Sequence, residues 1–233
     1  ICTLSLVLMM LVVLVKPIPV QAASSFSDIS SHWAKTSILQ LASLGYISGY
    51  TNGTFKPDNS MTRAEFTTVL VQCMGLDKSS TATASFSDVK NHWAAGYVNA
   101  AVNKGVLIPS EYPNGLKPDG AILRSEAAAM LVRALGQKAS TGSLTSFSDK
   151  TEIEKSMYKG YIKTAFDLGL MSGYSGKFVP FGAMTRGQVC TVMTTYLVKK
   201  GVTLPTISSA AATVTTAGST IKTLVIDDQS FSL

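Results

Sequence analysis

The sequence predicts a mainly α-helical protein made of three tandem helix-loop-helix repeats. The phrase Phe-Ser-Asp begins three times, at Phe26, Phe86 and Phe147, with spacings of 60 and 61 residues. Each phrase is followed by an amphipathic segment that ends near a glycine, then by a turn-rich loop and a second apolar segment of helical period. We place the three repeats at residues 23–83, 84–144 and 145–204.

The segment before the repeats, residues 1–22, is predicted to be a secretory signal peptide. An apolar run over residues 1–15 is interrupted by Lys16, and small side chains precede a cleavage point after Ala22, with Ala23 as the alternative. A transmembrane anchor would need about 20 apolar residues, and Lys16 cuts the run short of that length. No initiator Met or basic region precedes the run, so we expect the sequence to begin inside a longer reading frame.

The segment after the repeats, residues 205–233, is rich in Ser, Thr and Ala and shows no helical period. It contains too little apolar material to form a core of its own. We expect it to be a linker or the start of a further domain.

The mature chain is expected to be moderately basic. Removal of residues 1–22 leaves 19 Lys and Arg against 14 Asp and Glu, a net charge of +5. This charge suits a polyanionic partner on an outer surface, but without a basic run it does not predict nucleic-acid binding. Cys73 and Cys190 do not correspond between repeats, so we expect buried free thiols and no disulfide framework.

The first helix of repeat 1 is predicted over residues 32–44. Its apolar side chains recur at helical spacing and should share one broad face: Trp33, Ile38, Leu41, Ala42 and Leu44. Gly45 then ends the helix, and Gly105 and Gly169 occupy the same place in the other repeats, as expected of a C-terminal glycine in the left-handed conformation. A turn-rich loop with room for a short strand or hairpin follows over residues 48–57.

The second helix of a repeat is predicted to begin with a capping box, formed by Thr62 and Glu65 in repeat 1 and by Thr185 and Gln188 in repeat 3. Repeat 2 has Leu123 at the capping position, and the missing hydroxyl is expected to cost about 1 kcal/mol unless another group caps the helix. An arginine follows the cap in every repeat: Arg63, Arg124 and Arg186.

These phrases together resemble the S-layer homology repeat: Phe-Ser-Asp-Val, His-Trp-Ala, a Gly-Tyr loop with Gly-Thr-Phe-Lys-Pro, and Thr-Arg-Ala-Glu. The resemblance covers residues 26–200 in three ordered copies. It implies a pseudo-threefold bundle with a central three-helix core and grooves between neighbouring repeats. It also implies non-covalent anchoring of a secreted bacterial surface protein to the cell wall. The implied ligand is a secondary cell-wall polysaccharide, often carrying pyruvate ketals on N-acetylmannosamine.

A sugar with a fixed carboxylate needs cationic and apolar contacts, and the repeats contain candidates for both. Arginine at a helix start combines a planar charged fork with the positive end of the helix dipole, which gives Arg63, Arg124 and Arg186. Aromatic faces for the sugar ring and glycines that admit backbone donors give Trp33, Trp93, Gly49, Tyr50, Gly173 and Tyr174. Carboxylates that accept from sugar hydroxyls give Asp28, Asp88 and Asp149.

Each of these assignments has a structural alternative. Tryptophan on an apolar face serves as a core anchor, aspartate serves in turns and at helix starts, and arginine forms surface salt bridges. Both interpretations stay open for the tryptophans and aspartates, whereas recurrence at a helix start favours ligand binding for the arginines. We therefore expect Arg63→Ala to weaken polysaccharide binding and to leave the thermal midpoint nearly unchanged.

The three copies are unequal. In repeat 3 the tryptophan position is taken by Met157, after an insertion around residues 150–155. In repeat 2 the Gly-Tyr loop is replaced by residues 108–115, which removes the first glycine and adds the carboxylate of Glu111. Only repeat 1 keeps every element, so a groove that uses its residues is expected to be intact. The sequence leaves open which repeats share a groove.

Other functions are weighed against anchoring. A glycosidase needs two carboxylates at a set separation, for example Asp28 with Glu65 or Glu111 with Asp119, but no second acid recurs at a repeated offset. We predict no catalysis, cofactor or metal site in the repeats, although the chain is alternatively the anchor of a truncated glycoside hydrolase. A protein-binding helical repeat is disfavoured by the 60-residue period. Other surface-layer subunits are a further candidate partner.

Overall fold

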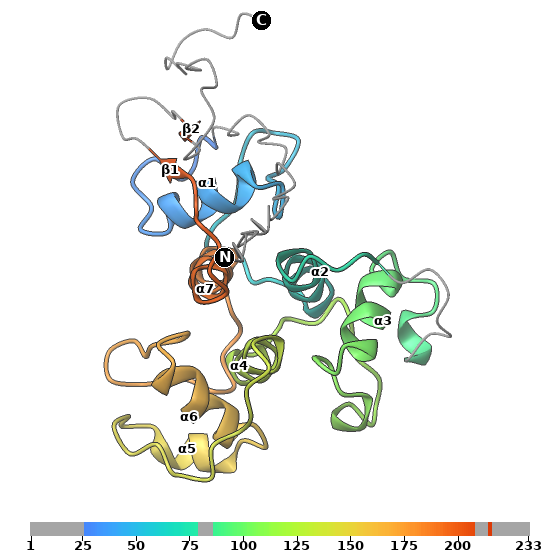
Figure 1. Ribbon diagram of the computed structural model, residues 1–233, viewed down its shortest axis with the longest axis vertical. Coiled ribbons are helices and arrows are strands. Elements are labelled where there is room, and N and C mark those ends of the chain that lie inside the picture. Colours follow the sequence, from blue (N-terminus) through green and yellow to red (C-terminus); the bar gives the residue numbers. More distant parts are fainter. Residues whose placement is uncertain (1–25, 79–85, 208–213, 216–233) are drawn as a thin grey trace, which may run out of the picture.

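The computed structural model describes residues 26–78, 86–207 and 214–215, and over this part the chain is mainly helical, as predicted (Figure 1). The predicted signal peptide and most of the predicted linker lie outside the described residues. In the described ranges no helix combines the length and apolar character needed to cross a bilayer.

The described helices follow the repeat order predicted from the sequence. Repeat 1 contains α1 (Lys35–Ser43) and α2 (Arg63–Cys73). Repeat 2 contains the 3-10 turns η1 (Ser87–Val89) and η2 (Pro109–Glu111) and the helices α3 (Ala95–Asn103) and α4 (Arg124–Ala134). Repeat 3 contains α5 (Lys150–Lys155), α6 (Lys159–Asp167) and α7 (Arg186–Lys199). Two short antiparallel strands follow, β1 (Thr206–Ile207) and β2 (Val214–Thr215).

The first helix begins three residues later than predicted, and Trp33 is therefore not on its buried face. Residues 32–34 form a turn in which the backbone N–H of Ala34 donates to Nδ1 of His32 at 3.1 Å, while Nε2 of His32 lies 3.3 Å from Asp58. Ile38 is fully buried as expected, whereas 63% of Trp33 is exposed. The predicted ends of the first helices are confirmed, because Gly45, Gly105 and Gly169 have φ values of 72°, 71° and 63°.

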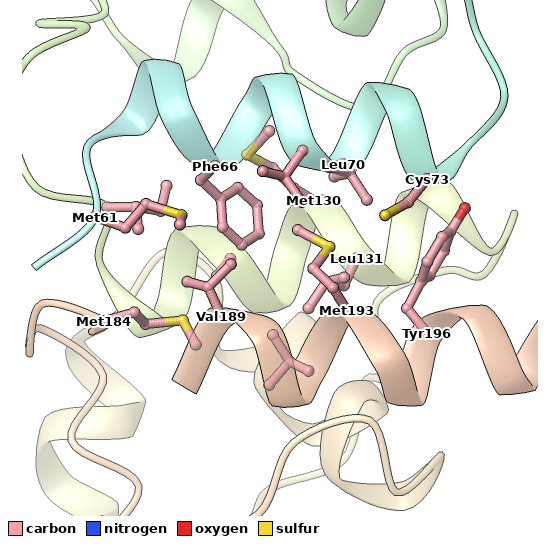
Figure 2. Packing of buried hydrophobic residues seen from close by; sticks show 14 of the residues in the cluster. Met61, Phe66, Leu70, Cys73, Met130, Leu131, Met184, Val189, Met193 and Tyr196 are labelled. Carbon is pink, nitrogen blue, oxygen red and sulfur yellow. The ribbon is translucent and has the colours of Figure 1, made fainter. Parts of the chain in front are cut away.

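The second helices α2, α4 and α7 form the centre of the molecule, where Figure 1 shows them nearly end-on. Their facing side chains fill the space between them, including Phe66, Leu131 and Met193 (Figure 2). Each first helix packs against the second helix of a different repeat: α1 against α7, α3 against α2 and α6 against α4. Each of these helix pairs therefore joins two repeats.

A ring of backbone hydrogen bonds joins the three repeats just before the central helices. Met61 N–H donates to the carbonyl of Met184 at 2.9 Å, Met184 donates to Ile122 at 3.0 Å, and Ile122 donates back to Met61 at 2.9 Å. The same residues are buried at the end of the central core, where Figure 2 shows Met61 and Met184. The ring fixes all three helix starts relative to one another.

The first N–H groups of each central helix also find partners in a different repeat. The backbone N–H groups of Arg63 and Ala64 donate to the carbonyls of Gly120 at 2.8 Å and Pro118 at 3.0 Å. The equivalent amides of α4 and α7 do the same: Arg124 to Gly182, Ser125 to Pro180, Arg186 to Asn59 and Gly187 to Pro57. Because the first amides of a helix have no partner inside their own helix, the loop of the next repeat supplies acceptors for the first two of them. The α4 helix receives the same two loop acceptors as α2 and α7, although Leu123 gives it no side-chain cap.

The aspartate of each Phe-Ser-Asp phrase holds the loop that makes these contacts. In repeat 1 the carboxylate of Asp28 accepts from the backbone N–H of Phe55 at 2.8 Å and of Lys56 at 2.7 Å. Asp88 and Asp149 accept from the equivalent pairs, Leu116 with Lys117 and Phe178 with Val179. Each of these aspartates thus has a structural role in the fold, as a loop clamp rather than as a helix cap.

The arginine of α2 forms an ion pair with repeat 2. Nη2 of Arg63 lies 2.9 Å from Oε1 of Glu126, and Nε of Arg63 donates to both carboxylate oxygens at 3.0 and 3.1 Å. Only 15% and 7% of the two side chains are exposed. The expectation that Arg63 could be removed without loss of stability is not supported by this geometry, because its loss would leave Glu126 as an unpaired buried charge.

We predict that Asp28→Asn makes the protein less stable and less sensitive to acid. Burial raises the pKa of Asp28, but hydrogen bonds from the backbone N–H groups of Phe55 and Lys56 lower it by more, so the folded-state pKa lies below its ordinary value. A lowered pKa gives stability that is present above the unfolded-state pKa, about 3.9, and is lost as the pH falls through the folded value. Urea unfolding from pH 7 to pH 2 measures this effect. The exposed Asp77→Asn serves as control, and equal acid sensitivity of the Asp28 variant and the wild type would refute the assignment.

We also predict that Arg63→Ala lowers the free energy of unfolding by about 3–5 kcal/mol, the usual cost of removing one partner of a buried ion pair. Replacing Glu126 by Gln in the same variant should recover part of this loss, because the unpaired carboxylate is then neutral. Chemical denaturation of the wild type, the single variants and the double variant gives the coupling between the two positions. A single variant with wild-type stability would show that the ion pair contributes nothing.

Candidate functional site

Two grooves of the same design lie between the repeats, and each takes residues from all three. Groove 1 has a volume of about 290 Å³ and lies on the loop and second helix of repeat 1. Groove 3 has a volume of about 740 Å³ and lies on the corresponding parts of repeat 3. In both cases the following repeat in the cycle supplies a tryptophan and the preceding repeat supplies an arginine.

Groove 1 combines α2 with Trp93 of repeat 2 and Arg186 of repeat 3. Its lining includes Tyr46 and Ile47, which follow the C-terminal glycine of α1. The helix contributes one face, because its lining residues recur at helical spacing: Glu65, Thr68, Val69 and Gln72.

Groove 3 combines α7 with Trp33 of repeat 1 and Arg124 of repeat 2. Its loop contributes Gly173 and Tyr174, and 82% of the Tyr174 side chain is exposed. The same helical face as in groove 1 lines it, with Gln188, Thr191, Val192 and Thr195. The helix residues of both grooves were missed from the sequence, although their three- and four-residue spacing after the capping position would have indicated a common face.

The two tryptophans lie at the edge of the grooves and are not core anchors. Trp33 and Trp93 are 63% and 61% exposed, and each ring lies beside the histidine that precedes it, with ring centroids 5.2 and 5.3 Å apart. Met157 is 65% exposed and lies in the equivalent turn. In this turn Oγ of Ser156 accepts a hydrogen bond from the backbone N–H of Tyr158, the place that the histidine nitrogen takes in the other two repeats. The prediction that Met157 takes the tryptophan position is consistent with this geometry.

The groove arginines are held in place by carbonyl groups of the loop they approach. Nε and Nη2 of Arg186 donate to the carbonyls of Phe55 and Ser48, both at 2.9 Å. Nε and Nη2 of Arg124 donate to Phe178 at 2.8 Å and Ser172 at 2.9 Å. Desolvation lowers the pKa of the Arg124 guanidinium, although the charge of Asp149 opposes this effect. These carbonyl contacts fix the orientation of each guanidinium.

The corresponding place on repeat 2, which we call the repeat-2 position, is occupied by the protein's own charged side chains. Arg133 stands where Gln72 and Thr195 line the two grooves, and it forms an ion pair with Glu111. The hydroxyl of Tyr158 donates to Glu111 at 3.2 Å, and the guanidinium of Arg133 lies 4.4 Å from the ring centre of Tyr161. The arginine that would serve this position, Arg63, is bound by Glu126.

The positions in repeats 2 and 3 that differ from the common repeat pattern therefore lie at one place in the structure. The altered loop and missing cap of repeat 2 belong to the repeat-2 position, and so does Met157 of repeat 3, since each groove takes its tryptophan from the following repeat. Groove 1 and groove 3 each keep a tryptophan and an arginine. The sequence favoured an intact groove that uses residues of repeat 1; of the predicted residues of that repeat, Trp33 lines groove 3, whereas Tyr50 lines neither groove.

The remaining predicted residues have packing roles as well. A Cβ atom on Gly49 would lie 2.3 Å from the Phe26 ring, and one on Gly173 would lie 2.2 Å from the Phe147 ring. Both glycines are thus required for loop packing, although Gly173 also lines groove 3. Tyr50 is 41% exposed and lies beneath Lys56, whose Nζ is 4.4 Å from the ring centre.

The carboxylate pairs considered for glycosidase chemistry are engaged in structural contacts. Asp28 clamps its loop, Glu65 closes the capping box of α2, and Glu111 is paired with Arg133. Among residues 26–78 and 86–207 there is also no group of three or more His, Cys, Asp or Glu placed to hold a metal ion.

Comparison with known proteins identifies the repeat. The family model of the S-layer homology domain matches residues 25–67, 85–128 and 146–190. S-layer protein EA1 of Bacillus anthracis is 33% identical over 176 residues, which are 73% of this chain and 20% of that protein. The cellulosome-anchoring protein of Acetivibrio thermocellus is 33% identical over 131 residues, 54% of this chain and 29% of the relative.

An enzyme is among the relatives too. Exoglucanase XynX of Acetivibrio thermocellus is 32% identical over 175 residues, 72% of this chain and 16% of the enzyme. The chain thus spans less than a third of the length of each of these relatives. Because the three family matches lie in tandem and together cover more than half of the chain, the protein belongs to the S-layer homology domain family.

Proposed function

We propose that this chain is the cell-wall anchoring part of a longer secreted surface protein and that it binds secondary cell-wall polysaccharide in groove 1 and groove 3. The observation that carries the proposal is the pairing, in both grooves, of an exposed indole with an arginine whose fork is held by loop carbonyls. An indole face packs against the C–H face of a sugar ring, and a fixed guanidinium binds a carboxylate or hydroxyl oxygen.

The ligand that best suits these contacts is an acidic glycan such as a pyruvylated polysaccharide. A pyruvate ketal places a carboxylate at a fixed position on the ring, so a preoriented arginine meets it at little entropic cost. The net charge of +5 expected for residues 23–233 favours approach to such a polymer.

The relatives support anchoring rather than catalysis by the repeats. Their printed names include an S-layer protein, a cellulosome-anchoring protein and an exoglucanase, and this chain aligns with only a small part of each. A module shared by proteins with such different names suits a common attachment role. The chain would then carry different partner domains to the wall, with a glycoside hydrolase or an S-layer domain as the two cargo classes.

Binding to purified cell-wall sacculi tests the proposal. The chain without residues 1–22 is incubated with sacculi that retain the secondary polysaccharide and with sacculi from which it has been removed chemically. Pelleting only with the intact sacculi is expected, since the ligand is the polysaccharide. Equal pelleting with both preparations would contradict the proposed ligand, and release of soluble sugar would indicate an enzyme.

We predict that Trp33→Ala and Trp93→Ala each weaken binding to intact sacculi. The double variant should pellet with intact sacculi no more than the wild-type chain does with stripped sacculi. Loss of one ring should cost about 1 kcal/mol at its groove, roughly a fivefold to tenfold loss, with a larger combined effect because the two grooves act on one polymer. Met157→Ala is the matched control, because this side chain is as exposed as the tryptophans but lies at the repeat-2 position. All four variants should keep the wild-type thermal midpoint. Equal weakening by the control substitution would remove the distinction between the grooves and the repeat-2 position.

A further inference from the structure

The residue three positions after each helix cap is glutamate in repeats 1 and 2 and glutamine in repeat 3, and it meets the incoming arginine in three different ways. At the repeat-2 position, Glu126 forms a close ion pair with Arg63, at 2.9 Å. In groove 1, Oε1 of Glu65 lies 3.8 Å from Nη1 of Arg186, a looser contact. In groove 3 the residue is Gln188, which carries no charge, and Arg124 has no acidic partner within ion-pair distance among the described residues.

The capping boxes determine which atom of this residue remains for the groove. Oε2 of Glu65 accepts from the backbone N–H of Thr62 at 2.8 Å, so Oε1 is the atom near Arg186. Oε1 of Gln188 accepts from the backbone N–H of Thr185 at 3.3 Å, so the amide nitrogen is the remaining polar atom. The same backbone geometry therefore offers an anionic acceptor in groove 1 and a neutral donor in groove 3.

The other groove residues reinforce this difference. Glu65 is the only acidic residue that lines groove 1, whereas none of the residues that line groove 3 is acidic. In groove 3, Nε and Nη2 of Arg124 make the two carbonyl contacts, and Nη1 has no hydrogen-bond partner within residues 26–78 and 86–207. A carboxylate accepts hydrogen bonds and donates none, so it gains two donors in groove 3 and meets a like charge in groove 1.

We propose that the two grooves differ in the charge of the sugar they prefer, with groove 3 selective for a carboxylated sugar and groove 1 for a neutral one. The specificity-determining position is the one occupied by Gln188 in groove 3 and by Glu65 in groove 1. This inference rests on the proposed polysaccharide binding and extends it. A polymer that alternates acidic and neutral sugars would then occupy both grooves without competition between them.

The two tryptophans provide a separate signal for each groove, because the chain contains only two and each lines one groove. The indole N–H signals of the ¹⁵N-labelled chain are followed by NMR during titration, with Trp33→Phe and Trp93→Phe giving the assignment. The probes are the methyl glycoside of N-acetylmannosamine with a 4,6-pyruvate ketal and the methyl ester of the same compound. The acid should shift the Trp33 signal at about tenfold lower concentration than the Trp93 signal, as expected for hydrogen bonds to a charged group, and the ester should remove this difference.

Exchange of the two residues completes the test. Glu65→Gln should lower the midpoint of the Trp93 titration with the acid about tenfold, and Gln188→Glu should raise that of Trp33 by a similar factor. The ester midpoints should change much less than the acid midpoints. Glutamate and glutamine both serve in capping boxes of this chain, so the exchanges should preserve the fold, and thermal midpoints verify this.

The possible results separate the inference from the proposed function. If both indole signals respond to acid and ester at the same concentrations, the grooves bind sugar without charge selectivity and only the inference is wrong. If an exchange shifts the acid and ester midpoints equally, the position does not determine charge preference. If neither signal responds to either probe and the chain also fails to pellet with intact sacculi, the proposed function is wrong as well.

Discussion

The structure depends on one interaction, the donation of backbone N–H groups from the start of each central helix to the loop of another repeat. The first amides of a helix lack intrahelical acceptors, and here the carbonyls of Pro57, Pro118 and Pro180 supply them across the repeat boundaries. The ring through Met61, Ile122 and Met184 closes the cycle. A single repeat would leave these amides and carbonyls unpaired, which explains in physical terms why the repeats occur together.

The same interaction builds the grooves. Because the helix start of one repeat is fastened to the loop of the next, the arginine after the cap crosses the boundary and lies on that loop. Because each first helix packs on the second helix of the preceding repeat, the tryptophan before it reaches the same groove from the other side. Each groove thus depends on all three repeats, and a substitution in one repeat changes a groove that lies mainly on another repeat.

Much of the fold could be predicted from the sequence, since local patterns decide it. The glycine ends of the first helices, the two complete capping boxes and the helix-loop-helix order were predicted correctly. The start of α1 was placed too early because apolar periodicity alone included Trp33, whereas His32 caps a separate turn with its ring nitrogen. The arrangement of the sites could not be predicted, because which loop meets which helix depends on contacts between residues of different repeats that lie far apart in the sequence, such as Arg186 with Ser48. The pairing of Arg63 with Glu126 was missed for the same reason.

The number of sugars bound per chain tests the central claim most directly, that three repeats form two open grooves and one position closed by its own ion pairs. Native mass spectrometry of the chain with a saturating excess of the pyruvylated and the neutral methyl glycosides together counts the bound molecules. The account predicts a maximum of two per chain. A third bound molecule would show that the Glu111–Arg133 pair does not close the repeat-2 position, and a single one would show that groove 1 and groove 3 are not independent sites.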